Sequence, residues 1–426
     1  MDNLQRIQPP VFPVNKVVIP EAKSFRLNNG VPVYLIEAGT EDIMRIEFTF
    51  RAGQVKELKP LLASTCSMML SEGSRNFSSE ELNRLLDYYG VFLNQSAEKD
   101  SAGIILFFLS KHIEKVLELS HEILFRPAFP EPELNALMKK RLSWYLVNRE
   151  KVQNLAMDQF FQSLFGKNHP YGYQIQTQDF ENINPALLID FHSKYYSPDN
   201  MAVIISGKIH YKTLGLLNSY FGSIISKEIN FEDSVNLLKG EKVKKVHINK
   251  PGTVQSAIRI GSSTINKRHS DYPGLKILDS ILGGYFGSRL MKNIREEKGY
   301  TYGISSSLTS FDLAGYKVIS TEVGRKNCQN TIDEIYREIK LLQSVPVKKE
   351  EMSVVRNYMS GEMVRMFDGP FALAESFKSA WEFGLDNTYY YRLADKIKTI
   401  DRDEIIDLAG TYYNIDDLYE ITVGTE

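Results

Sequence analysis

The sequence is poor in cysteine, in net charge and in long apolar runs. Two cysteines in 426 residues, Cys66 and Cys328, exclude a disulfide framework, and no Cys-x-x-Cys pair offers a redox or zinc motif. The 51 basic and 53 acidic side chains leave a net charge of −2, which excludes a global field that attracts nucleic acid or an anionic membrane. The most hydrophobic region has the apolar run Ile104–Leu109, far shorter than the roughly 20 residues that cross a bilayer. We therefore expect neither a nucleic acid partner nor a membrane segment.

Targeting signals are also missing from the N-terminal residues. Residues 1–16 contain three prolines and lack both the apolar stretch of a secretory signal and the arginine-rich character of a mitochondrial presequence. Together with the low cysteine content, this predicts a cytoplasmic, reducing environment.

The usual catalytic motifs are absent. None of the seven histidines is in an HxxH or HxxxH pair, so no metal-binding helix is indicated. No Gly-x-Ser-x-Gly elbow occurs, and Cys66 lies on an apolar helix stripe, where a thiol is usually inert packing. Gly283, Gly284 and Gly287 form a GGxxG pattern without the βαβ frame of a dinucleotide site. Read alone, the residues indicate a protein without an active site.

What the sequence does contain is the pattern of a large folded chain. With 43% hydrophobic and 24% charged residues, the length fits two domains of about 200 residues. Period-two alternation predicts strands, and apolar spacings of three and four predict helices. The strands are expected at Val31–Ile36, Ile43–Phe50 and Ser101–Leu109, and helices at Ile113–Leu124 and Pro132–Val147. This segregation favours an α+β fold in which helices pack on one face of a mostly antiparallel sheet.

An internal repeat divides the chain. The segments Ile183–Gly207 and Ile400–Gly424 align without a gap at an offset of 217 residues. Tyr195 and Tyr196 of the first copy match Tyr412 and Tyr413 of the second. A duplicated domain explains this economically, and the stretch 224–252 has the Lys, Glu, Gly and Pro content of a surface linker. We predict two homologous domains, residues 1–234 and 235–426.

The C-terminal half contains a long motif that resembles the insulinase/pitrilysin family of zinc metallopeptidases in its two-domain form. The motif begins with Leu282-Gly283-Gly284-Tyr285-Phe286-Gly287-Ser288-Arg289-Leu290 and continues as Ile294-Arg295-Glu296-Glu297-Lys298-Gly299-Tyr300-Thr301-Tyr302-Gly303. It resembles the family's glycine-rich turn, Ser-Arg-Leu helix and Arg-Glu-x-x-Gly-x-x-Tyr element. The resemblance runs almost end to end and implies the same two-domain α+β fold.

The N-terminal half is similar to the family in its frame but not in its catalytic residues. Where the family has His-x-x-Glu-His, this chain has Ser64-Thr65-Cys66-Ser67-Met68. Ser64, Ser67 and Met68 therefore stand at degenerate zinc-motif positions. The third ligand, a Glu expected some 75 to 80 residues further on by analogy with this metal class, has no candidate, because the stretch reads Arg141-Leu142-Ser143-Trp144-Tyr145 there. We expect no metal in this chain.

One branch of the family divides its active site between two chains, and the resemblance to that branch implies roles for two residues. Its non-zinc subunit keeps an Arg/Tyr pair that reaches the partner's zinc site, and Arg295 and Tyr302 match this pair. Tyr300 is a nearby competitor. Without the resemblance, Arg295 beside Glu296, Glu297 and Lys298 reads as a salt-bridge cluster at a helix end.

Three further residues are expected to bind substrate. Asn94 matches the family's Asn beside the substrate-binding strand, although an ordinary turn residue would read the same way. Gly283 and Gly284 correspond to the turn before the Ser-Arg-Leu helix, and they permit either close passage of substrate or a tight bend.

The resemblance thus implies a non-zinc-binding subunit of a heterodimeric zinc metallopeptidase that supplies Arg295 and Tyr302 for peptide hydrolysis. We expect no cofactor in this chain alone, a zinc-bearing homologous partner, and a peptide substrate. The alternative is an inactive structural or assembly subunit like the core proteins of the respiratory chain. A self-sufficient enzyme requires a constellation that the sequence does not contain, and a homodimer of this chain would bring no zinc.

Overall fold

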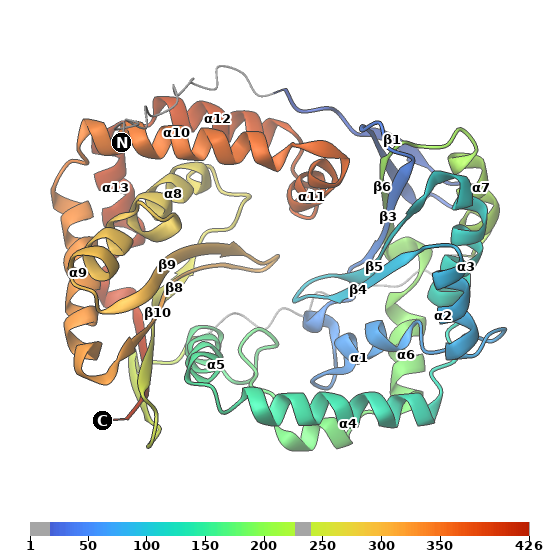
Figure 1. Cartoon of the computed structure of the whole chain (residues 1–426), viewed down its shortest axis with the longest axis horizontal. Helices are drawn as coiled ribbons and strands as arrows, with labels where there is room; N and C mark the ends of the chain where they lie inside the picture. The colour runs from blue at the N-terminus through green and yellow to red at the C-terminus, as the bar shows by residue number, and fades with distance from the viewer. Residues whose placement is uncertain (1–17, 226–239, 426) are drawn as a thin grey trace, which may run out of the picture.

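The computed structural model describes residues 18–225 and 240–425. They form two α+β halves that lie side by side, each built around one sheet (Figure 1). The predicted domain boundary at 234/235 lies outside the described residues. No helix in the described ranges has the length and apolar character that crossing a membrane requires.

The first half contains a six-stranded sheet of strand order β1-β2-β6-β3-β5-β4. All neighbours pair antiparallel except β2 and β6. The strands are β1 (Lys23–Arg26), β2 (Pro32–Glu37), β3 (Ile43–Phe50), β4 (Phe92–Ala97), β5 (Ala102–Leu109) and β6 (Met201–Gly207). The helices are α1 (Leu62–Met69), α2 (Ser79–Tyr88), α3 (Ile113–Phe125), α4 (Glu131–Asn148), α5 (Val152–Phe165), α6 (Pro185–Tyr195) and α7 (Thr213–Phe221).

The second half contains a five-stranded sheet of order β7-β11-β8-β10-β9, in which only β7 and β11 pair parallel. Its strands are β7 (Lys245–Asn249), β8 (Gln255–Thr264), β9 (Thr301–Ser310), β10 (Gly315–Gly324) and β11 (Tyr419–Gly424). Its helices are α8 (Tyr272–Asp279), α9 (Cys328–Ser344), α10 (Lys349–Met366), α11 (Gly369–Trp381), α12 (Thr388–Thr399) and α13 (Arg402–Tyr412). Two π-helical turns, η5 (Ser280–Gly284) and η6 (Met291–Glu297), follow α8.

The α+β class and the two-domain architecture are confirmed, and the strands and helices expected from sequence lie within a few residues of their predicted ranges. The capping box of α2 shows how local sequence sets a boundary. The Ser78 side chain accepts the Glu81 backbone N–H, and the Glu81 carboxylate accepts the Ser78 N–H. The offset of 217 residues that relates the repeat segments also relates α5 to α11 and α6 to α13.

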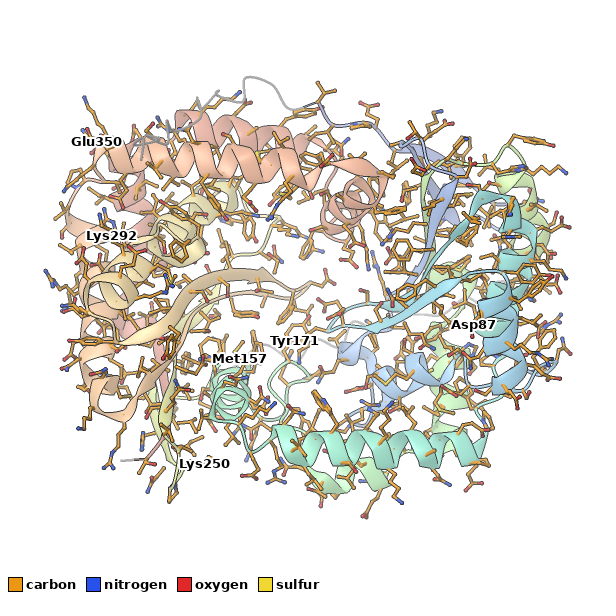
Figure 2. All side chains as sticks on the ribbon, viewed as in Figure 1. Asp87, Met157, Tyr171, Lys250, Lys292 and Glu350 are labelled. Atoms are coloured by element: carbon orange, nitrogen blue, oxygen red, sulfur yellow. The ribbon has the colours of Figure 1, made fainter. Side chains whose placement is uncertain are left out.

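Each half lends one helix to the sheet of the other. The helix α5 packs on β8 and β11 of the second sheet, and α11 packs on β6 and β2 of the first. In Figure 1 both helices lie toward the centre, between the two sheets. Figure 2 labels Met157 on α5 and Tyr171 on the loop that follows, and both lie in this central region. Helices therefore cover both faces of each sheet, an exchange that the predicted one-face packing did not include.

Candidate functional site

Arg295 and Tyr302, the predicted catalytic pair, are joined directly. Arg295 lies in the π-helical turn η6, and its Nε donates a 2.9 Å hydrogen bond to the main-chain oxygen of Tyr302 at the start of β9. The guanidinium also lies over the ring of Phe286, with Cζ 4.6 Å from the ring centroid. The spacing of seven residues thus brings a guanidinium and a phenol to the same edge of the second sheet.

A β-bulge presents Tyr302. The register between β9 and β10 shifts between the pairs Thr301–Val323 and Ile304–Thr321, so Tyr302 and Gly303 both lie opposite Glu322. Bulges turn a side chain away from the regular alternation and leave part of the strand unpaired. The Tyr302 side chain is accordingly 94% exposed.

Tyr300, the competing tyrosine, lies differently. Its backbone N–H donates to the oxygen of Ile294, and its side chain packs, half-buried, against the core of the second half. Tyr302 is therefore better placed than Tyr300 to meet a ligand at this edge.

The two arginines of the C-terminal motif have different partners. Arg289 forms a bidentate contact with Glu351 of α10, at 2.7 and 3.0 Å, which fastens the Ser-Arg-Leu segment to the fold. Arg295 has no carboxylate partner among the described residues, and the nearby Lys298 pairs with Glu334 instead. The alternative reading of Arg295 as part of a helix-end salt-bridge cluster is therefore not what the geometry shows.

Beside the pair lies a hollow of about 640 Å³ between α5 and the edge of the second sheet. Gly283, Gly284 and Phe286 of the glycine-rich turn line it on one side, and Gln153, Asn154 and Met157 of α5 line it on the other. Arg259, which pairs with Glu322 at 2.8 Å, and Glu322 itself also line it. Two of the predicted substrate-binding residues thus share a concave site with the neighbours of Arg295.

Only one of these two glycines is required by packing. A Cβ at Gly283 would come within 2.6 Å of the Ser306 backbone nitrogen on β9, so no side chain fits there. Gly284 is exposed, and its Cβ would meet no atom closer than 3.3 Å. Gly283 therefore serves the close approach of η5 to β9, whereas Gly284 keeps the rim of the hollow open.

The degenerate zinc-motif positions lie on α1, where a cationic side chain contacts them. The Arg141 guanidinium of α4 donates to Thr65 Oγ1 at 2.5 Å and to Ser64 Oγ at 2.8 Å. Ser67 is buried and donates to the oxygen of Ser96, and the Met68 side chain is half-exposed. Of the residues that replace the ligands, Ser64 and Ser67 are therefore hydrogen-bonded within the protein, and Met68 is partly exposed to solvent.

This arrangement does not fit zinc. Structural and catalytic zinc sites need imidazole, thiolate or carboxylate ligands, and the described residues contain no cluster of three such groups. A guanidinium already lies against the helix and repels a second cation. Glu57, next to Arg141, has its pKa raised to about 7 by burial, so this carboxyl is partly protonated at neutral pH. Burial also raises the pKa of the Cys66 thiol, which removes it as a ligand or nucleophile.

Asn94 lies apart from the Arg295 pair. Asn94 is exposed on β4, the edge strand of the first sheet. It therefore does not lie in a turn, the alternative that its sequence context also allows. No contact among the described residues joins Asn94 to Arg295 or Tyr302. Its neighbour Gln95 donates to the oxygen of Met68, so β4 runs alongside the degenerate motif of α1, and Asn94 belongs to the opposite face of that strand.

Sequence reasoning missed several residues of this site. In the sequence, Phe286 is only one residue of the glycine-rich motif, and Arg141 only stands near the expected position of the third zinc ligand. The lining residues of α5 carry no sequence signal, because nothing in a helical pattern shows that the helix packs on the sheet of the other half. The bulge at Tyr302 is likewise a property of strand pairing.

Comparison with known proteins finds a matching family model for part of the chain and several relatives. Residues 182–359 match the family model described as "Peptidase M16 inactive domain". The "Uncharacterized zinc protease YmxG" of Bacillus subtilis is 22% identical over 346 residues, 80% of this chain and 83% of that protein. The "Non-peptidase homolog YmxG" of Helicobacter pylori is 22% identical over 91% of this chain and 90% of its own length. "Mitochondrial-processing peptidase subunit alpha-1" of Dictyostelium discoideum is 25% identical over 39% of this chain and 26% of its own length.

A solved structure gives the same fold. The crystal structure of a peptidase M16 inactive domain from Pseudomonas fluorescens superimposes with a TM-score of 0.84 at 20% identity, covering 95% of this chain and 98% of that one. The M16 peptidases are the insulinase/pitrilysin type, so the resemblance stated from the motifs is confirmed. This chain thus has the fold of the M16-type proteins and a degenerate zinc motif.

Proposed function

We propose that this chain, whose degenerate motif does not fit zinc, is the non-zinc-binding subunit of an M16-type peptidase. It would supply Arg295 and Tyr302 to a peptide-hydrolysing site that a zinc-bearing homologue completes. One observation carries the proposal. Arg295 is tied to the Tyr302 backbone, has no carboxylate partner among the described residues, and lies over Phe286, which lines the hollow. The exposed Tyr302 precedes Gly303, which also lines it. Fold resemblance alone would not support it, because one fold hosts many functions.

The chemistry of the two side chains suits peptide hydrolysis. Negative charge develops on the carbonyl oxygen of the scissile peptide bond, and positioned donors lower the barrier. Arg295 would hold this oxygen with a permanent charge through its terminal nitrogens, because Nε is occupied by the Tyr302 carbonyl. The Tyr302 hydroxyl would donate a second hydrogen bond. Zinc in the partner would supply the activated water, which this chain cannot provide.

The peptide would bind beside the pair. The strand β9 is the edge of the second sheet, and an extended peptide can add to such an edge through main-chain hydrogen bonds. The hollow lined by Gly283, Gly284 and Phe286 lies next to that edge and offers space for a side chain. Asn94 lies on the corresponding edge strand of the first sheet, where it would contact a longer peptide that spans both halves.

The experiment mixes the purified chain with a homologue from the same source that carries His-x-x-Glu-His and measures peptide cleavage. We expect activity only in the mixture, reduced about 10²- to 10³-fold by Arg295→Ala. Tyr302→Phe should reduce it and Tyr300→Phe should not. The control is Arg325→Ala, since Arg325 is an exposed arginine on the second half. Full activity of the Arg295→Ala mixture would contradict the proposed role.

A structural or assembly subunit is the second candidate. The Arg141 contacts at the degenerate motif favour it, because they stabilise α1 against α4 and exclude a metal without needing any catalysis. A stable complex with the homologue whose peptidase activity does not depend on Arg295 would support this alternative.

A further inference from the structure

An exposed phenylalanine next to Arg295 has no packing role that explains it. Phe286 is 62% exposed, although burying an aromatic ring is strongly favourable. The ring nevertheless lies face-on beneath the Arg295 guanidinium, at 4.6 Å from Cζ to the ring centroid. A guanidinium over an aromatic face is attracted by the ring quadrupole, which is strongest where water is excluded.

The loop that carries Phe286 is held at three points. The neighbouring Tyr285 stacks on Tyr358 of α10 with ring centroids 4.6 Å apart. Gly283 contacts β9 so closely that no side chain fits, and Arg289 is fastened to Glu351. The ring of Phe286 is therefore presented from a rigid turn.

The Phe286 ring is a second constraint on Arg295. Its Nε is held by the Tyr302 carbonyl along one edge of the guanidinium, and the Phe286 ring covers one face. The edge contact fixes the position of the group, and the face contact fixes the plane in which it lies. Neither terminal nitrogen has a hydrogen-bond partner among the described residues, so both are available to an acceptor on a ligand.

We propose that Phe286 is a positioning residue for Arg295, whose ring fixes the plane of the guanidinium at the rim of the hollow so that both terminal nitrogens face the substrate oxygen. The proposal rests on the proposed function for its catalytic consequence, but the stacking contact itself belongs to this chain alone. Removing the ring should therefore change the environment of Arg295 whether or not the partner is present.

The first measurement uses the isolated full chain. With ¹⁵N-labelled arginine, the Nε–Hε resonance of Arg295, assigned by its loss in Arg295→Lys, should carry a ring-current shift. Phe286→Leu keeps an apolar side chain of similar size without the ring and should abolish this shift, whereas Phe286→Trp should retain a ring-current displacement. Since Phe286 is exposed, we expect unchanged circular dichroism and thermal midpoint. An Arg295 resonance that is the same in Phe286→Leu as in the wild type overturns the proposal.

The second measurement uses the mixture with the zinc-bearing homologue. Phe286→Leu should lower kcat by about threefold to tenfold with little change in KM, and Phe286→Trp should restore kcat. On an Arg295→Ala background, Phe286→Leu should have no further effect, because the ring acts through the guanidinium.

The two measurements distinguish a failure of the positioning role of Phe286 from a failure of the proposed function. If Arg295→Ala lowers activity while Phe286→Leu does not, the positioning role is wrong and the proposed function stands. If the Arg295 resonance responds to Phe286→Leu but Arg295→Ala leaves the mixture fully active, the contact is confirmed and the proposed function fails.

Discussion

The two helices exchanged between the halves are held by opposite kinds of chemistry. The helix α5 packs on the second sheet through an apolar and aromatic cluster that includes Phe160, Phe165 and Tyr316, with Arg259 as a buried cation on the same face. The helix α11 packs on the first sheet through Leu373, Ala374 and a network of charges.

The charged contact is unusually buried. Arg45 and Glu47 of β3 are 0% and 1% exposed, and they pair with each other at 2.6 Å. Glu375 and Lys378 of α11 reach them at 2.5 Å each. An apolar contact tolerates small shifts because it depends on buried area, whereas ion pairs in a buried site fix one register. Equivalent positions in a duplicated chain thus carry the same helix but not the same source of stability.

The largest expected effect is at the apolar contact. Phe160→Ala empties a fully buried position under the second sheet and should lower the free energy of unfolding by about 3–5 kcal/mol. Because no charge is involved, the loss should be the same in 0.1 M and 1 M salt, as measured by urea denaturation. The control Trp144→Ala removes a 69% exposed ring and should cost less than about 0.5 kcal/mol. A loss below that of the control would show that the cluster does not hold α5.

A pH titration tests the α5 contact in a second way, because ionisable side chains lie at the edge of that contact. Lys99 lies over the ring of Phe161, and it interacts with Glu57, whose pKa is raised by burial from 4.5 to about 7. The folded state therefore holds a proton that the unfolded state releases, so this stability is present below pH 4.5 and lost as the pH rises to 7. Glu57→Gln should remove about 2–3 kcal/mol of the decline between pH 5 and pH 8.

This effect is read as the difference between two urea denaturation series, one for the wild type and one for Glu57→Gln. The exposed Glu297→Gln is the control and should leave the pH dependence unchanged. Parallel pH profiles for wild type and Glu57→Gln would mean that Glu57 stays ionised in the fold.

The smallest expected effect is at the charged contact. Lys378→Met leaves Glu47 with Arg45 as its remaining partner among the described residues, in a buried site, and should cost about 1–2 kcal/mol. The matched control is Lys115→Met, which breaks the exposed pair with Glu118 and should cost about 0.3 kcal/mol. Equal losses in the two variants would mean that the α11 contact is no stronger than a surface ion pair.

The fold was largely predictable because its signals are local. Alternation in Ile43–Phe50 predicts β3 with the bounds that the structure shows, and the repeat predicts the correspondence of α6 with α13. The same alternation could not predict that the polar face of β3 is buried in the folded protein. Arg45 and Glu47 would ordinarily face solvent in an antiparallel sheet, but α11 from the other half covers them.

The residues of the candidate site are a prediction from the motif, and their geometry comes from the structure. The motif selected Arg295 and Tyr302, and the loss of His at Ser64 and Met68 argued against zinc. Sequence could not choose between Tyr300 and Tyr302, because the bulge that exposes Tyr302 depends on the pairing of β9 with β10. It also could not show that Phe286 lies beneath Arg295 or that Arg141 contacts the degenerate helix.

The sequence by itself determined the class of fold, the duplication, the family resemblance and the loss of the zinc-motif residues, since each depends on residue type and spacing along the chain. Only the tertiary structure decided which helix covers which sheet, which tyrosine is presented and what occupies the degenerate motif. The physical reason is that these features depend on contacts between residues such as Arg45 and Glu375, or Ser64 and Arg141, that are distant in sequence. Burial, ion pairing and strand register at such contacts are set by the assembled fold.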